Sequence, residues 1–334
     1  MKRRSLSIWI FLGSLVVAML GYLFLPCPNT HPQNAMYGIT WSKPYAESLG
    51  IDASAGLRAT LDDLHVKYFR IPAYWTEVQP KQNNFYWTAL SDQLNLIAAH
   101  DGKVILVVGA KQPRWPEFWI PQWAGALSEV EREKAQLNYI EETVKKFNTH
   151  PAVMAWQVEN EASFPFGTGE RQPDTFIEQE MDLVHRLSHY PVYTTDSGEL
   201  STWLGFHEHI DRLGVSVYRV INNRYIGRWR YTFLPPWFYV RKANLLAPWI
   251  KPIYVSEFQM EPWAETPLPL TPLDQQFHIF PLEQMEKNFS YAQKMELPAI
   301  YFWGTEWWYW MKTKMHHPEF WNAAKAFFTR NQAK

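Results

Sequence analysis

The feature that most constrains the fold is an alternation of short and long segments along nearly the whole chain. Short runs rich in β-branched and aromatic residues are followed by longer amphipathic stretches. Such alternation is typical of βα units, in which parallel strands are joined by crossover helices. Eight strands are predicted, at Met36 to Trp41, Val66 to Ile71, Lys103 to Gly109, Ala152 to Val158, Pro191 to Thr195, Leu213 to Tyr218, Ile253 to Ser256 and Ala299 to Trp303.

Helices are predicted between these strands and after the last one. Ser128 opens one of them with Glu131 three residues later, the spacing of a capping box. Eight strands with intervening helices predict a single (β/α)8 barrel over residues 36–334, with its active site at the carboxyl ends of the strands. The predicted helices are Ala53 to Leu64, Trp87 to His100, Ser128 to Phe147, Asp174 to His189, a short Phe206 to Arg212, Pro236 to Leu246, Pro281 to Met295 and Pro318 to Thr329.

The composition fits one large globular domain and excludes some partners. A chain of 334 residues with 47% hydrophobic residues can bury a large core. Its formal net charge of -1 offers no electrostatic footprint for nucleic acid. The 18 tryptophans suit either the flat faces of sugar rings or a Trp-rich core. Cys27 is the single cysteine, so neither an intrachain disulfide nor a thiolate metal cluster can form.

The N-terminus predicts a membrane anchor. Three basic residues, Lys2 to Arg4, precede an uncharged and mostly apolar run from Ser5 to Leu25. At ~1.5 Å per residue this run would span about 31 Å, close to the hydrocarbon thickness of a bilayer. We therefore expect a transmembrane signal anchor over residues 1–25 and a linker over 26–35. The basic flank predicts an extracytoplasmic catalytic domain that stays attached to the membrane.

Two other readings of the N-terminus are a cleaved signal peptide and a lipoprotein. Cleavage would give a secreted protein, but no Ala-x-Ala-like site follows the apolar run. Cys27 would be the lipid-bearing residue of a lipoprotein, yet it follows Pro26 rather than a small residue. The signal anchor is therefore the favoured hypothesis.

Two glutamates carry the candidate chemistry. The run from Trp156 to Val158 leads through Glu159 and Asn160 into Glu161, and a second apolar strand ends at Ser256, just before Glu257. Glycoside cleavage needs two carboxyl groups, one to protonate the leaving oxygen and one to attack the anomeric carbon. The pair predicts a glycosidase.

With these strands placed, the chain over roughly residues 36–330 resembles clan A glycoside hydrolases, the retaining (β/α)8 superfamily with paired glutamates on strands four and seven. Gln157 to Glu161 resembles the acid/base strand of the β-galactosidase-type families 35 and 42. Phe69 to Pro72 instead resembles family 5, the cellulase and mannanase-like family. The two signals agree on the clan.

The resemblance implies roles for the strand-end residues. Glu161 would be the general acid/base, Asn160 would bind the C2 hydroxyl of the sugar, and Glu257 would be the nucleophile. Arg70 and Tyr218 would hold the Glu257 carboxylate ionised and oriented.

Three further residues are candidates for contact with the sugar. Trp303 would floor the subsite in which the bond breaks. Gln112, after strand three, and Glu306, after strand eight, are each read either as sugar contacts or as loop supports. Glu159 is read as a supporting carboxylate or as half of an ion pair inside the barrel.

The sequence departs from both family patterns. Ser216 stands where family 5 places a histidine two residues before the tyrosine, and Ala162-Ser163 replaces the aromatic-glycine pair of β-galactosidase-type strands. The resemblance therefore implies a carbohydrate substrate without naming the sugar.

Other chemistries find little support. His207 and His209 have ligand-like spacing, but no matching carboxylate set follows, and Ser197-Gly198 lacks the preceding glycine of a nucleophile elbow. No metal or cofactor is expected.

Two alternative functions are a catalytically silent carbohydrate-binding barrel and a transglycosylase.

The segment from Val220 to Ile250 is rich in arginine and aromatic residues. It either rims the sugar groove, lies on a membrane surface, or is a solvated loop with a packed helix.

Overall fold

Eight parallel strands close into a barrel in the computed structural model, which describes residues 13–14, 17–26, 35–223 and 227–332. The order around the barrel follows the sequence, and β1 closes it by pairing with both β2 and β10. The predicted (β/α)8 barrel and its eight strands are therefore confirmed. The strands are β1 (Met36–Thr40), β2 (Tyr68–Pro72), β3 (Lys103–Val108), β4 (Val153–Val158), β5 (Val192–Ser197), β6 (Arg212–Val217), β9 (Ile253–Gln259) and β10 (Ala299–Trp303).

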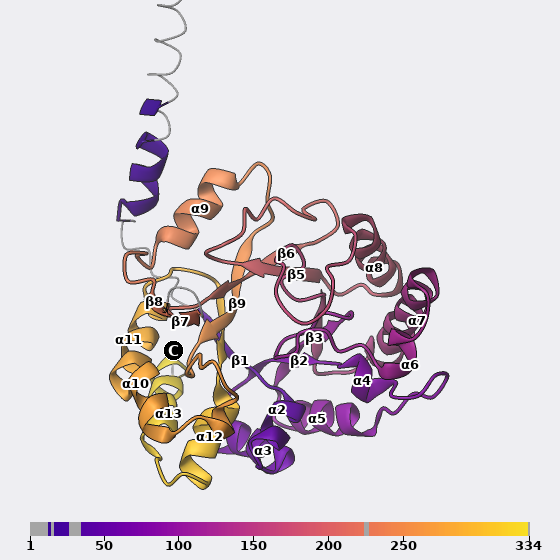
Figure 1. The fold of residues 1–334 in the computed structure, drawn as a ribbon, viewed down its shortest axis with the longest axis horizontal. Helices are drawn as coiled ribbons and strands as arrows, with labels where there is room; N and C mark the ends of the chain where they lie inside the picture. Colours follow the sequence, from indigo (N-terminus) through magenta and orange to yellow (C-terminus); the bar gives the residue numbers. More distant parts are fainter. Residues whose placement is uncertain (1–12, 15–16, 27–34, 224–226, 333–334) are drawn as a thin grey trace, which may run out of the picture.

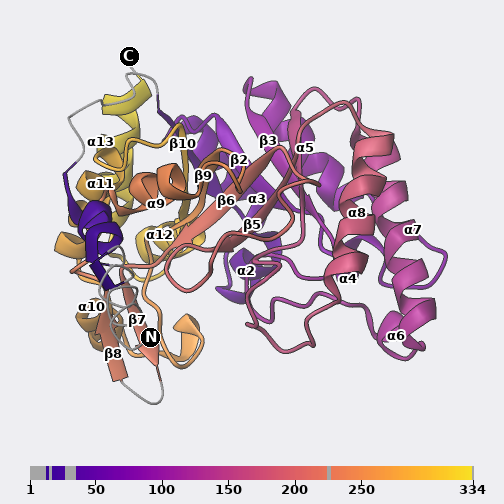
Figure 2. The same ribbon diagram turned by 90° about the horizontal axis from the view of Figure 1, so that it is seen from above.

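Helices cover the outside of the barrel (Figures 1 and 2). α7 begins at the predicted capping box, because Ser128 and Glu131 each accept a hydrogen bond from the other's backbone N–H. The helices are α2 (Lys43–Ser48), α3 (Ala53–Asp62), α4 (Trp75–Val78), α5 (Thr88–Ala99), α6 (Gln122–Gly125), α7 (Glu129–Phe147), α8 (Asp174–Leu187), α9 (Phe238–Leu246), α10 (Leu273–Ile279), α11 (Leu282–Gln293), α12 (Thr305–Thr313) and α13 (Glu319–Gln332), with a 3₁₀ turn at Leu268–Leu270.

The predicted short helix from Phe206 to Arg212 is wrong. Residues 205–209 form bends and turns, and Arg212 already belongs to β6. Asp211 fixes this path, since its backbone N–H donates to Val192 O and its carboxylate accepts from Val192 N. Both bonds tie the segment to the start of β5, which leaves no room for a helical turn.

The core has two layers. The larger layer lies between the strands and the helices. The smaller layer fills the barrel interior near the amino ends of the strands. In the smaller layer Tyr254 packs against Tyr193 and Tyr301, with ring centroids 5.3 and 6.0 Å apart. This plug leaves only the end of the barrel nearest the strand carboxyl ends for a functional site.

The segment after β6 forms a structure that the sequence did not predict. β7 (Val220–Asn223) and β8 (Gly227–Arg230) pair as an antiparallel hairpin outside the barrel, and α9 follows within the predicted range Pro236 to Leu246. Trp229 and Phe233 remain exposed there. The described residues of this segment therefore form a hairpin and a helix rather than a simple loop.

The chain before the barrel rests on α9. Residues 17–24 are helical and project beside α9, as Figure 1 shows in indigo. Phe24 packs against Phe238 with 6.0 Å between ring centroids, Trp237 Nε1 donates to Phe24 O, and Arg241 donates to Pro26 O. None of the helices in the described ranges is long and apolar enough to cross a membrane. About half of the predicted span from Ser5 to Leu25, namely residues 5–12 and 15–16, lies outside those ranges.

Candidate active site

A bulge in β9 places Glu257 in the mouth of the barrel. The pairing of β9 slips by one residue against both neighbouring strands between Val255 and Phe258. A bulge re-aims the side chains that follow it. Glu257 thus lies inside β9, which continues to Gln259 instead of ending at Ser256 as predicted. Its carboxylate accepts from Arg70 Nη1 at 2.7 Å on one oxygen and from Tyr218 OH at 2.8 Å on the other.

Arg70 on β2 connects the residues around Glu257. Its side chain is fully buried, and the guanidinium donates through Nε to Gln157 Oε1 at 2.7 Å and through Nη2 to Asn160 Oδ1 at 2.6 Å. Arginine suits this role because its planar fork presents several donors in fixed directions. The carboxylate of Glu257 and the amide of Asn160 are therefore held side by side by one cation.

The end of β4 turns sharply to present Glu161. Both Glu159 and Glu161 have positive φ, 58° and 44°, a strained conformation for residues other than glycine. The turn is held by Thr195, whose hydroxyl accepts from Glu161 N at 2.7 Å and donates to Asn160 Oδ1 at 3.0 Å. Asn160 and Glu161 thus share one support on β5.

The Glu161 carboxyl group has different surroundings from Glu257. Ser216 Oγ donates to it at 2.5 Å, which puts the serine that replaces the family 5 histidine in direct contact with the candidate acid. Burial first, and then the negative charge of Glu257, raise the pKa of Glu161 to about 7. Two glutamates in one site thus have distinct partners.

Glu159 supports the loop after β3 and forms no ion pair with any residue that the structure describes. Its carboxylate accepts from the backbone N–H groups of Ala110 and Lys111 at 2.7 and 2.6 Å. Glu180 of α8 lies against it, and burial, followed by the charge of Glu159, raises the pKa of Glu180 well above its ordinary value. Gln136 Nε2 lies between the two glutamates and donates to Glu159 Oε1 at 3.1 Å and to Glu180 Oε1 at 2.5 Å.

A third glutamate enters the site from the loop after β3. Glu117 Oε2 accepts from Asn160 Nδ2 at 3.0 Å, and the residue is only 5% exposed. Burial and then the charges of Glu257 and Glu161 raise the pKa of Glu117 well above its ordinary value. Sequence reasoning missed Glu117 because it lies nine residues beyond the end of β3, where strand position gives no signal.

Trp303 and Glu306 belong to a second buried cluster. The Arg114 guanidinium lies between the rings of Tyr45 and Trp303, 3.7 and 3.8 Å from their centroids. It pairs with Glu306 at 2.7 Å and with Glu261. Glu306 also accepts from Ser42 N, so both of its oxygens have partners within the protein. One face of Trp303 is covered by Arg114.

The Gln112 side chain bonds to none of the site carboxylates in the described ranges. Its Nε2 donates to Gly109 O at 2.8 Å, Tyr139 OH at 3.1 Å and Ala73 O at 3.3 Å, and the residue is fully buried. The structure thus groups Arg70, Asn160, Glu161, Tyr218 and Glu257 together, places Trp303 and Glu306 in the neighbouring cluster, and leaves Gln112 under the β3 loop.

Aromatic rings border the mouth of the site. Trp263 meets Tyr218 edge to face at 4.9 Å, and it also contacts Phe166 at 5.8 Å. Phe166 in turn contacts Trp115 at 6.1 Å, and Trp115 is 65% exposed. A row of rings therefore runs from the hydroxyl that binds Glu257 to the protein surface, a surface suited to the apolar faces of sugar rings.

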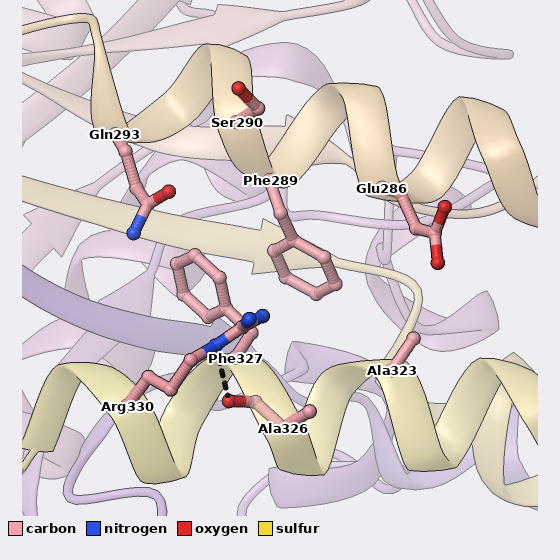
Figure 3. Close-up of a pocket in the computed structure, with 8 residues that line it drawn as sticks. All are labelled: Glu286, Phe289, Ser290, Gln293, Ala323, Ala326, Phe327 and Arg330. Carbon is pink, nitrogen blue, oxygen red and sulfur yellow. Dashed lines mark hydrogen bonds between the residues drawn. The ribbon is translucent and has the colours of Figure 1, made fainter.

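Other parts of the molecule offer little chemistry. No group of three or more histidine, cysteine, aspartate or glutamate side chains within the described ranges could hold a metal ion. A surface groove between α11 and α13 (Figure 3) has stacked Phe289 and Phe327 at its centre and none of the candidate residues. The only dashed hydrogen bond there joins Arg330 Nε to Ala326 O within α13. The barrel mouth is the candidate site.

Comparison with known proteins gives a match at the level of the fold. No family model and no curated protein sequence matches the chain. Among solved structures, xylanase 10B from Thermotoga maritima is similar at 16% identity and a TM-score of 0.59, covering 90% of this chain and 97% of that one. A family 5 mannosidase from Rhizomucor miehei matches at 12% identity and a TM-score of 0.59, covering 91% and 95%.

A third similar structure contains a sugar. It is a family 5 subfamily 18 protein from Streptomyces cattleya in complex with N-acetylglucosamine, at 13% identity and a TM-score of 0.55, covering 81% of this chain and 70% of that one. All three neighbours are clan A (β/α)8 proteins. The chain therefore shares the (β/α)8 barrel fold of these structures, as its sequence led us to expect.

Proposed function

We propose that this protein is a retaining β-glycoside hydrolase in which Glu257 is the nucleophile and Glu161 the general acid/base. The observation that carries the proposal is the difference between the two carboxyl groups. Each oxygen of Glu257 accepts a hydrogen bond from a separate donor, Arg70 or Tyr218. Such bonds favour the ionised form that a nucleophile needs.

Glu161 has the surroundings of a proton donor. Its pKa, raised to about 7, keeps it mostly protonated in mildly acidic solution and about half protonated at pH 7. Glu161 is 7% exposed and Glu257 3% exposed, so little water surrounds either group before a substrate arrives. A carboxyl group that stays protonated near pH 7 can deliver its proton to a departing oxygen.

The reaction follows from these roles. The Glu257 carboxylate attacks C1 of the sugar while the proton of Glu161 moves to the glycosidic oxygen, and the bond between C1 and that oxygen breaks. Glu161, now ionised, takes a proton from water, whose oxygen attacks C1 and releases Glu257. Arg70 holds Glu257 and Asn160 in fixed relative positions through both steps. The two inversions at C1 leave its configuration unchanged.

The substrate that we propose is a β-linked oligosaccharide or polysaccharide. The row of rings from Tyr218 to Trp115 supports this class, since aromatic faces stack on the apolar faces of sugars. The neighbours described as xylanase and mannosidase act on different sugars, so they do not select one.

The stereochemistry of the first product tests the mechanism. An aryl β-glycoside that the enzyme turns over is followed by proton NMR from the first minutes. We expect the β-anomer to form first and the α-anomer to appear only by slow mutarotation. An α-anomer as the first product would instead require an interposed water and would exclude Glu257 as nucleophile.

We also propose that the residues before the barrel anchor this domain to a membrane, with the barrel on the extracytoplasmic side. The apolar run from Ser5 to Leu25 and the preceding basic residues support the proposal. The contacts of Phe24 and Pro26 with α9 also support it, because they would hold the barrel close to the end of such an anchor.

A further inference from the structure

The third carboxyl group of the site, Glu117, is 5% exposed and has a hydrogen-bond partner on only one of its oxygens. Of its two oxygens, Oε2 accepts from Asn160 Nδ2, while Oε1 accepts no hydrogen bond from any residue in the described ranges. A buried carboxyl group without a charged partner is costly unless something pairs with it. The missing partner is therefore expected to come with the substrate.

The nearest cations within the described ranges are committed elsewhere. Arg70 directs its donors to Gln157, Glu257 and Asn160. Lys111 Nζ donates to Glu161 O at 2.9 Å and to Phe164 O at 2.6 Å. Neither side chain donates to Glu117, so no cation in the described ranges bonds to the carboxyl group where the sugar would sit.

The position of Glu117 relative to the sugar follows from Asn160. Arg70 joins Asn160 to Glu257, and Glu257 faces C1 in the proposed mechanism, so the Asn160 amide lies beside the carbon next to C1. Glu117 is one hydrogen bond further along the same direction. Its free oxygen is then in reach of the substituent on C2.

The loop that carries Glu117 is fixed in place. Its backbone N–H donates to Arg114 O, and its carbonyl accepts from Gln112 N, both at 2.8 Å. The Gly167 backbone lies so close that a Cβ there would come within 2.7 Å of Glu117 Cβ. A side chain held in this way can select between substituents, because it cannot move aside for a poor fit.

We propose that Glu117 determines specificity at C2 and selects a sugar bearing an amino group there, a substrate class that rests on the proposed function. An ammonium group donates hydrogen bonds to the free oxygen, and its positive charge favours the ionised form of Glu117, whose pKa is raised in the protein alone. A C2 hydroxyl provides the donor without the charge. An acetamido group adds bulk and removes the charge, so it fits worst.

The test compares aryl β-glycosides that differ only at C2, in both gluco and galacto configurations. They carry an amino, a hydroxyl or an acetamido group. We expect kcat/KM for the amino sugar to exceed that for the acetamido sugar by at least ~10-fold. In Glu117→Gln the ratio of amino to hydroxyl substrate should fall by about 10- to 100-fold, the effect of losing one charge-assisted hydrogen bond. Glu170→Gln, which removes an exposed charge from the neighbouring loop, should leave the ratio unchanged.

A binding measurement keeps this inference separate from the proposed function. Calorimetry with free glucosamine and galactosamine should show at least ~10-fold weaker binding to Glu117→Gln than to the native protein. Equal binding of both amino sugars to the two proteins, or an unchanged substrate ratio, would overturn the role of Glu117. Failure of every glycoside to turn over, with the expected loss of binding in Glu117→Gln, would overturn the hydrolase and leave Glu117 as the determinant of an amino-sugar binding site.

Discussion

Arg70 Nη1 lies 2.7 Å from Glu257 Oε1, and both side chains are almost completely buried. The two residues are 187 positions apart in sequence. They lie on β2 and β9, which are not neighbours in the barrel. Closure of the barrel brings them together. The proposed nucleophile therefore depends on a contact that only the complete fold creates.

Replacing Arg70 with methionine should reduce kcat/KM by roughly 100-fold, about 3 kcal/mol of transition-state stabilisation. The change leaves Glu257 without its cation and removes one of the two donors to Asn160 Oδ1, the other being Thr195. Arg70→Lys should lose less, because it keeps the charge but not the planar fork. Steady-state kinetics on one aryl glycoside measure both, and circular dichroism checks the fold. A folded Arg70→Met enzyme with native kcat/KM would mean that Arg70 is only structural.

Activity should fall as the pH rises through about 7. Glu161 has a pKa raised to about 7 by burial and by Glu257, so the protonated form that the first step needs is lost above that pH. The pH dependence of kcat/KM measures this limb. A plateau that continues well above pH 8 would show that another group donates the proton.

Ser216→Ala should move the basic limb of the pH dependence of kcat/KM to higher pH. Ser216 Oγ donates to Glu161 Oε1 at 2.5 Å, and this bond favours the ionised carboxylate, so the pKa of Glu161 rises when the bond is removed. Comparison of the two pH profiles on the same substrate gives the shift. If the limb stays in place or moves to lower pH, Ser216 does not bond to the catalytic acid.

The free energy of unfolding should depend on pH through the pair of Glu159 and Glu180. Their folded-state pKa values are raised, that of Glu159 from 4.5 to about 7. This contribution to stability is complete below pH 4.5 and is lost as the pH rises through the folded-state values. Glu180→Gln removes one of the titrating groups. The free energy of unfolding of this variant should therefore fall less steeply between pH 5 and 8 than that of the native protein.

Urea denaturation at several pH values measures this slope. Glu178→Gln on the same helix is the matched control, because Glu178 is only partly buried. The control should keep the slope of the native protein. An equal slope in native protein and Glu180→Gln would show that the pair does not share a proton.

The full-length protein should remain in the membrane pellet after an alkaline carbonate wash. Hydrophobic insertion does not depend on charge, whereas a peripheral protein is released. A chain that begins at Asn34 should stay in the supernatant. Intact-mass analysis provides the second readout, and a mature protein that begins near residue 27 would replace the anchor with cleavage or lipidation.

The sequence predicted the barrel well because each strand and most helices carry their own pattern. Seven of the eight strands differ from the predicted ranges by one to three residues at their ends, and β10 has the predicted range. The failures have local causes. The turn at residues 205–209 is fixed by the bonds of Asp211 to β5, and the β7–β8 hairpin follows β6 after only two residues. Tertiary contacts of this kind leave no periodic signal.

The site was partly predictable for a similar reason. Residues at strand ends, such as Glu161 and Tyr218, can be placed from strand order alone. Glu117 and Arg114 come from a long loop, and their positions depend on how that loop folds back over the barrel. Gln112 shows the reverse, since its place after β3 suggested a sugar contact while its side chain bonds to carbonyls beneath the loop.

Azide rescue tests the two catalytic assignments most directly. In Glu257→Ala an azide ion can enter from the vacated face and attack C1, which should restore turnover and give the α-glycosyl azide. In Glu161→Ala azide should instead attack the glycosyl-enzyme and give the β-glycosyl azide, with an activated leaving group that needs no proton. NMR of the two azide products distinguishes them. Recovery of the β-azide from Glu257→Ala, or of the α-azide from Glu161→Ala, would contradict the account.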